Sequence, residues 1–103
     1  MEGFGGLNLQ EYIDFLQRYI IVHSYIYYEM DENLISDRDY DAAAKKLVQL
    51  KTDYPLLWIN SEYHKQFGDD YNGSTGFTLY HELSDRQKEI IQSIIHNIFR
   101  KGD

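Results

Sequence analysis

Residues 27–41 read YYEMDENLISDRDYD and join two segments of helical periodicity. Two adjacent tyrosines, Tyr27 and Tyr28, end the first segment. Asp37, Tyr40 and Asp41 fall in the first turns of the second, and on a helix this spacing places them on one face. The stretch therefore predicts a helical hairpin whose turn carries aromatic faces and carboxylates. Such a surface suits a flat, cationic, hydroxyl-bearing ligand.

The segment before this stretch predicts one long helix over about residues 8–30. Asn8 suits the N-cap because Glu11 follows three residues later, which is the spacing of a capping box. Apolar side chains then recur near helical spacing along the segment. We expect His23 to pack or to hydrogen-bond within the helix bundle. The turn after the helix is expected to bend at Asn33.

A second helix is predicted over about residues 36–54. Ser36 is a good N-cap with Asp39 three residues later, and Pro55 marks the expected end. Alanine, leucine and tyrosine side chains form its apolar face. Because the connection between the two helices is short, we expect them to pack antiparallel.

The rest of the chain predicts an irregular segment, residues 56–83, and a C-terminal amphipathic helix, about 84–100. In the irregular segment, residues 56–59 are apolar and are expected to close the base of the helical pair. Residues 68–76 are rich in turn formers and predict a loop, and 77–80 predict a short extended stretch. Ser84 caps the last helix, whose apolar stripe is expected to cover both earlier helices. The stripe consists of Ile90, Ile91, Ile94, Ile95, Ile98 and Phe99.

These elements predict an all-α fold, and 103 residues of 12.3 kDa suffice for one domain, residues 1–103. Within it we distinguish a helical hairpin (8–57), a loop-rich segment (58–83) and a helical segment (84–101).

Charge and composition exclude several classes of function. A net charge of −7 and a pI near 4.9 argue against direct nucleic-acid binding, which needs clustered cations. The absence of cysteine excludes disulfides and thiolate metal sites, and no histidine pair has metal-binding helical spacing, so we expect no metal. The sequence shows neither a leader nor an apolar run of about 20 residues. We therefore expect a cytoplasmic protein without a membrane partner.

From the first helix to Pro55, about half of its length, the chain resembles the small helical N-terminal domain, Ia, of bacterial NAD-dependent DNA ligases. The resemblance rests on YIYYEMD (25–31), ISDRDYD (35–41), Leu47, Leu50 and the pair Tyr54-Pro55. In those ligases this domain grips the nicotinamide mononucleotide (NMN) half of NAD, while a nucleotidyltransferase domain supplies the adenylylated lysine. The resemblance implies NAD or NMN as ligand, bound by Tyr27, Tyr28, Asp37, Tyr40 and Asp41. Tyr28 stands where some family members have histidine.

The resemblance implies a non-catalytic nucleotide-recognition module. The Lys-x-Asp-Gly motif of the ligases is missing, because Lys51-Thr52-Asp53 is followed by Tyr54. Carboxylates are poor neighbours for phosphate. A phosphate contact would have to come from Arg38, Lys45, Lys46 or the N-terminus of the second helix.

Other interpretations remain open. The five residues could be ordinary packing aromatics and first-turn acids. The fold could serve as the scaffold of a small acidic interaction protein, such as a phage-type inhibitor of a host nucleic-acid enzyme or defence system. Its protein partner would then be engaged through the acidic surface or the C-terminal helix. A third alternative is a subunit that completes a separate nucleotidyltransferase.

Overall fold

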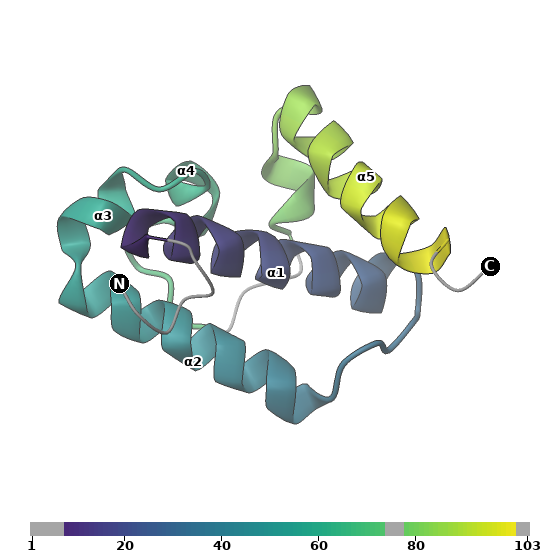
Figure 1. The fold of residues 1–103 in the computed structure, drawn as a ribbon, viewed down its shortest axis with the longest axis horizontal. Coiled ribbons are helices and arrows are strands. Elements are labelled where there is room, and N and C mark those ends of the chain that lie inside the picture. Colours follow the sequence, from purple (N-terminus) through teal and green to yellow (C-terminus); the bar gives the residue numbers. More distant parts are fainter. Residues whose placement is uncertain (1–7, 74–77, 101–103) are drawn as a thin grey trace.

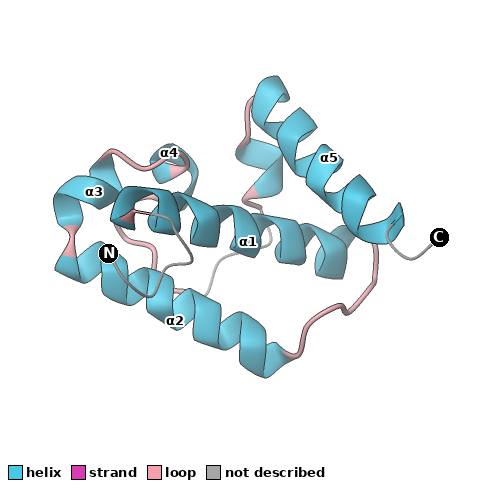
Figure 2. Ribbon diagram, in the orientation of Figure 1, coloured by secondary structure: helices cyan, strands magenta, loops and turns pink. Residues whose placement is uncertain are grey.

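A computed structural model describes residues 8–73 and 78–100. Helix α1 lies at the centre of the fold, and the other helices surround it (Figures 1 and 2). α2 runs antiparallel beside α1, and all secondary structure in the described residues is helical. The predicted all-α class is therefore confirmed. The elements are α1 (Leu9–Glu29), α2 (Asp37–Asp53), α3 (Pro55–Ile59), α4 (His64–Phe67), the 3-10 turn η1 (Tyr80–Glu82) and α5 (Asp85–Arg100).

The three predicted N-caps are confirmed by their hydrogen bonds. Asn8 and Glu11 form a reciprocal capping box, with distances of 2.8 and 3.0 Å between side-chain oxygen and backbone nitrogen. The Ser36 hydroxyl accepts the backbone N–H three residues later at 3.0 Å. Ser84 and Gln87 repeat the reciprocal arrangement at the start of α5, at 3.0 and 3.1 Å. Because each cap satisfies donors that a helix leaves unpaired, the caps fix where the helices begin.

The connection between α1 and α2 turns at Asp31 rather than at the expected Asn33. Asp31 adopts a positive φ of 55°, and the N–H of Glu32 donates to the carbonyl of Ile26 at 3.0 Å. Aspartate tolerates this left-handed conformation better than most residues. The chain turns directly after α1 and bends again at Leu34 and Ile35, and α2 then runs back beside α1.

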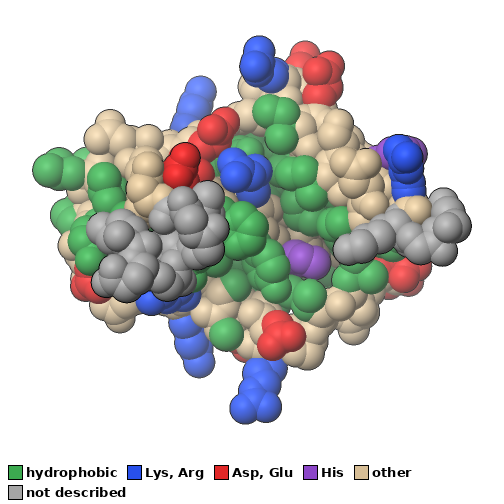
Figure 3. All heavy atoms as spheres, in the orientation of Figure 1, with side chains coloured by type: hydrophobic (Ala, Val, Ile, Leu, Met, Phe, Trp, Pro, Cys, Tyr) green, Lys and Arg blue, Asp and Glu red, His purple; other side chains and the backbone are tan. Residues whose placement is uncertain are grey.

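The stripe of α5 is buried only in part, and it packs on α1 rather than across both helices as expected. Ile91 and Ile95 are buried against the core, whereas Ile90 and Phe99 are 39% and 40% exposed. The reason is visible in Figure 1, where α5 crosses α1 obliquely and leaves α2 on the other side. Figure 3 shows hydrophobic side chains gathered over α1 between α2 and α5.

Residues 56–83 are less irregular than the sequence suggests. Pro55 ends α2 as expected but also begins α3, because the first position of a helix needs no N–H donor. Within the apolar patch only Trp58 is deeply buried, and Leu56 and Ile59 are 73% and 53% exposed, so the patch does not close the base of the pair as a unit.

Residues 78–80 form a turn and the start of η1, not an extended stretch. Phe77, and the expected continuation of α5 to residue 101, lie outside the described residues.

An aromatic cluster of Trp58, Phe67 and Tyr71 gives this segment its place in the core. The Trp58 ring stacks on Tyr71 with centroids 6.1 Å apart, and Phe67 meets Tyr71 edge-on at 4.8 Å. The indole N–H of Trp58 donates to the carbonyl of Gly68 at 3.1 Å. All three rings are buried in the same cluster as the apolar residues of α1 and α2.

One buried polar side chain ties α1 to this segment. Gln17 is completely buried; its amide donates to the Ser61 hydroxyl at 2.8 Å, and its carbonyl accepts the Tyr63 N–H at 3.1 Å. Ser61 in turn donates to the Trp58 carbonyl at 2.6 Å. The amide thus satisfies both ends of its hydrogen-bonding capacity in the interior.

We expect Gln17→Met to lower the free energy of unfolding by about 1–3 kcal/mol, because the buried Tyr63 N–H would lose its acceptor. Urea unfolding followed by circular dichroism measures this. Gln49→Met is the matched control, since Gln49 is exposed on α2 and bonds only to Asp53 there; its effect should stay within about 0.5 kcal/mol. Equal losses of unfolding free energy in the two variants would show that the buried Gln17 hydrogen bonds do not stabilise the fold.

The end of α1 is held by η1 on one side. Tyr25 and Tyr80 meet with ring centroids 4.5 Å apart, and the His81 Nε2 lies 2.8 Å from a carboxylate oxygen of Glu29. Tyr27 and Tyr28 remain half exposed, at 52% and 51%. The last turns of α1 are therefore held by η1, and the side chains of these two tyrosines stay about half exposed.

Candidate functional site

A cavity of about 390 Å³ lies where the end of α1 meets the start of α2. Its walls come from the last turns of α1, the connection 32–36, the first turns of α2 and Gly73. Small-molecule sites in proteins commonly have volumes of about 300–1,000 Å³. The size is therefore suitable for a small organic ligand.

All five residues proposed as ligand contacts from the sequence line this one cavity. Tyr27 and Tyr28 come from α1 and Asp37, Tyr40 and Asp41 from α2, so the short turn brings the two sets together. The spacing of Asp37, Tyr40 and Asp41 places these three on one side of α2, as expected.

The two tyrosines of α1 are not core residues. Their rings are about half exposed and meet edge-on, with centroids 4.9 Å apart and an interplanar angle of 82°. About half of each side chain is therefore outside the packed interior of the domain. Each ring keeps a surface for contact with a ligand that enters the cavity.

Tyr40 is half-buried at the base of the cavity, where its hydroxyl lies 2.6 Å from the Ser24 hydroxyl. Burial raises the pKa of Tyr40, although the hydrogen bond with Ser24 works in the opposite direction. The phenol therefore stays protonated at neutral pH. The bond joins α1 to α2 directly under the site and holds the Tyr40 ring in position.

The sequence missed several residues that line the cavity, above all His23 and Glu32. We expected His23 to pack or hydrogen-bond within the bundle; it is partly buried, touches the Tyr19 ring at 4.6 Å between centroids, and faces the cavity as well. Its position one helical turn before Tyr27 is the signal that would have placed it on this face. Ser24, residues 33–36 and Gly73 complete the lining.

The electrostatic character of the cavity is acidic. Glu32, Asp37 and Asp41 contribute carboxylates, and none of the described residues that line the cavity is lysine or arginine. Burial lowers the pKa of His23, so its ring is neutral at pH 7 and adds no positive charge. Carboxylates beside tyrosine rings favour a planar cation that carries hydroxyl groups, since the rings attract the charge and the carboxylates accept hydrogen bonds.

In the part of the chain that the structure describes, no group of three or more histidine, aspartate or glutamate side chains is placed to hold a metal ion. None of the helices in residues 8–73 and 78–100 combines the length and the apolar character needed to cross a bilayer.

Comparison with known proteins gives a consistent result for the first part of the chain. The profile of the family described as "DNA ligase-like, N-terminal NAD+-binding domain" matches residues 7–61. These residues include α1, α2, α3 and, except for Gly73, the whole lining of the cavity. No solved structure matches the chain significantly.

Proteins named DNA ligase are similar to the same part of the chain. The ligase of Endomicrobium trichonymphae is 43% identical over 50 residues, 48% of this chain and 7% of the ligase. The ligase of Lawsonia intracellularis is 34% identical over 55 residues, 53% of this chain and 8% of the ligase. That of Francisella tularensis subsp. novicida is 43% identical over 63 residues, 60% of this chain and 9% of the ligase. The matched part of the chain thus spans less than a tenth of the length of these relatives.

Proposed function

The chain belongs to the family of DNA ligase-like, N-terminal NAD+-binding domains, and we propose that it recognises the nicotinamide half of NAD+ in the cavity between α1 and α2. What supports this most is that the five residues carried over from the ligases line one cavity of suitable size. The family gives the class of ligand, and the acidic, aromatic lining fits the charge and shape of oxidised nicotinamide.

Each side chain has a role in this proposal. Tyr27 and Tyr28 hold the positively charged ring by stacking and cation–π attraction, worth about 0.5–2 kcal/mol. Asp37 and Asp41 accept hydrogen bonds from the ribose hydroxyls. The Tyr40 hydroxyl, which the Ser24 hydroxyl holds, forms the base of the site.

We assign no chemical step to the chain itself. The matched segments correspond to less than a tenth of the ligases, and the sequence has no Lys-x-Asp-Gly motif to supply an adenylylated lysine. We propose that the hairpin 8–57 carries the ligand site, and that 58–83 and 84–101 support it within a single domain. The comparisons match ligases and lend no support to the phage-inhibitor alternative.

Calorimetric titration with NMN, NAD+ and NADH tests the proposal. NMN and NAD+ should bind saturably with one site per chain. NADH should bind about 2- to 30-fold more weakly than NAD+, because the reduced ring is neutral and loses the cation–π attraction. If folded protein shows no saturable binding at millimolar ligand, or binds NADH as tightly as NAD+, the proposal is wrong.

A further inference from the structure

A second hollow adjoins the cavity along α2. It has a volume of about 530 Å³ and shares two lining residues with the cavity, Asp41 and Gly73. We call it the α2 groove. The remaining residues of its lining come from the following turns of α2 and from Asn72. A ligand that fills the cavity can therefore extend past Asp41 and Gly73 into this groove.

Gly73 forms the boundary between the two hollows. It adopts a φ of +90°, where a residue with a side chain would be strained. A Cβ built on Gly73 would lie 3.6 Å from the Ala44 Cβ and 3.7 Å from the Val48 Cγ2, so the loop backbone rests against α2. The positive φ, rather than a lack of space for a side chain, is what favours glycine at this position, where the loop lies against α2.

None of the described residues that line the cavity offers a counter-charge for the phosphate of a mononucleotide. Glu32, Asp37 and Asp41 place carboxylates there, and a phosphate group beside them would be repelled. The N-terminus of α2 offers little compensation, because the Ser36 hydroxyl already accepts an N–H there and Asp37 and Asp39 supply two first-turn carboxylates. The phosphate must therefore lie beyond the carboxylates.

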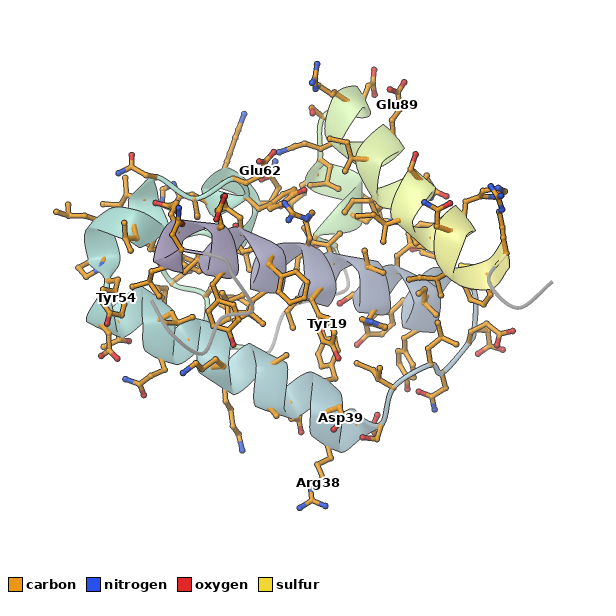
Figure 4. The ribbon with its side chains drawn as sticks, in the orientation of Figure 1. Tyr19, Arg38, Asp39, Tyr54, Glu62 and Glu89 are labelled. Atoms are coloured by element: carbon orange, nitrogen blue, oxygen red, sulfur yellow. The ribbon has the colours of Figure 1, made fainter. Side chains whose placement is uncertain are left out.

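Lys45 is the only lysine or arginine among the described residues that line either hollow. The other cations near this region are directed elsewhere. Arg38 projects from α2 away from α1 (Figure 4), and the Lys51 Nζ donates to the Asp69 carbonyl at 2.6 Å. Arg18 lines a separate apolar hollow between α1 and α5.

Lys45 also stands at a suitable position along the helix. It follows Asp41 by one turn, which is a rise of about 6 Å on the same face. This step is comparable with the reach from a ribose hydroxyl to the 5′-phosphate of the same nucleotide. Thr52 lines the groove further along and provides a neutral hydroxyl donor, whereas the Gln49 amide there already donates to Asp53.

We propose that the α2 groove is a phosphate subsite in which Lys45 supplies the counter-charge for the 5′-phosphate of a nicotinamide nucleotide. The proposal rests on the proposed function, because it places a phosphate relative to a nicotinamide riboside unit held in the cavity. The cationic nucleoside would lie in the acidic cavity, and the phosphate would lie beside Lys45 in the α2 groove.

The test compares nicotinamide riboside, which lacks the phosphate, with NMN, at low salt. In the unchanged protein NMN should bind up to about fivefold more tightly than the riboside, as expected for one solvent-exposed charge pair. Lys45→Gln should remove this difference and leave riboside binding as it was. High salt should also reduce the difference in affinity between NMN and the riboside, because it screens the charge pair.

Lys46→Gln is the matched control, because Lys46 is the neighbouring exposed lysine and lines neither hollow. It should retain the preference for NMN. The subsite is disproved if Lys45→Gln keeps the preference, or if both variants lose it equally, which would indicate a general surface field. Failure of both ligands to bind folded protein would overturn the proposed function, and the subsite with it.

Discussion

Changing Tyr27 and Asp37 to alanine together is expected to lower the affinity for NMN by about 30-fold or more while the protein stays folded. The ring of Tyr27 accounts for about 0.5–2 kcal/mol through contact with the nicotinamide cation, and Asp37 for about 1.5–3 kcal/mol through a charge-assisted hydrogen bond. The sum of about 2–5 kcal/mol corresponds to roughly 30-fold to 5,000-fold in the dissociation constant. Because the site is open to solvent, we expect the lower part of this range.

Tyr27 and Asp37 test both walls of the cavity because they belong to different helices. Tyr27 lies on α1 and Asp37 on α2, and both line the cavity at the junction. Tyr27 is 52% exposed and Asp37 is exposed, so neither contributes much to the core. Thermal unfolding followed by circular dichroism should therefore show only a small shift, including about 0.3–1 kcal/mol for the lost first-turn charge.

A control variant with the same two substitutions away from the cavity is Tyr54→Ala combined with Asp39→Ala. Tyr54 is 42% exposed at the junction of α2 and α3, and Asp39 lies in the same helical turn as Asp37 but outside the lining. The control should bind NMN as the unchanged protein does. Similar losses in both double variants, or retained affinity in the first, would show that the cavity is not the binding site.

The sequence predicted the hairpin well because its signals are local. Caps at Asn8, Ser36 and Ser84 are set by residues three positions apart, and a helix converts that spacing directly into geometry. The same conversion placed Asp37, Tyr40 and Asp41 on one side of α2, whereas Tyr27 and Tyr28 were proposed from the resemblance to the ligases. Only a short turn had to be assumed to bring them together.

Features that depend on contacts between distant residues were not predicted. Gly73 reaches the cavity because the loop that contains it rests on α2, and no local pattern specifies that contact. The aromatic cluster around Trp58 has no helical or strand periodicity, so the segment looked loop-rich although it contributes to the core. The position of α5 likewise depends on its crossing angle with α1, which periodicity does not fix.

We expect Trp58→Ala to cause a large loss of folding stability. The side chain is almost completely buried, at 1% exposure, and is surrounded by Phe67, Tyr71 and the core of the hairpin. Its removal should cost about 3–5 kcal/mol, and the Gly68 carbonyl would lose the indole donor. A domain of this size has a total stability of about 5–15 kcal/mol, so much of it would be lost. Urea unfolding should be followed by circular dichroism, because Trp58 is the only tryptophan.

Two further variants separate the contributions of this residue. Leu56→Ala changes a residue of the same short helix, α3, that is 73% exposed, and should alter stability by no more than about 0.5 kcal/mol. Trp58→Phe keeps an aromatic ring but removes the indole N–H. Its loss of stability should lie between those of Trp58→Ala and Leu56→Ala. If Trp58→Ala were as mild as Leu56→Ala, the 58–83 segment would not belong to the cooperative core.

Trp58→Ala should also weaken ligand binding at the cavity. Tyr71 stacks on Trp58 two residues before Gly73, which lies between the cavity and the α2 groove. Loss of the indole removes the surface on which Tyr71 rests, so the loop that carries Gly73 loses its support. We therefore expect Trp58→Ala, measured at a temperature where it is still folded, to bind NMN more weakly than Leu56→Ala does. Unchanged affinity would mean that the hairpin alone forms the site.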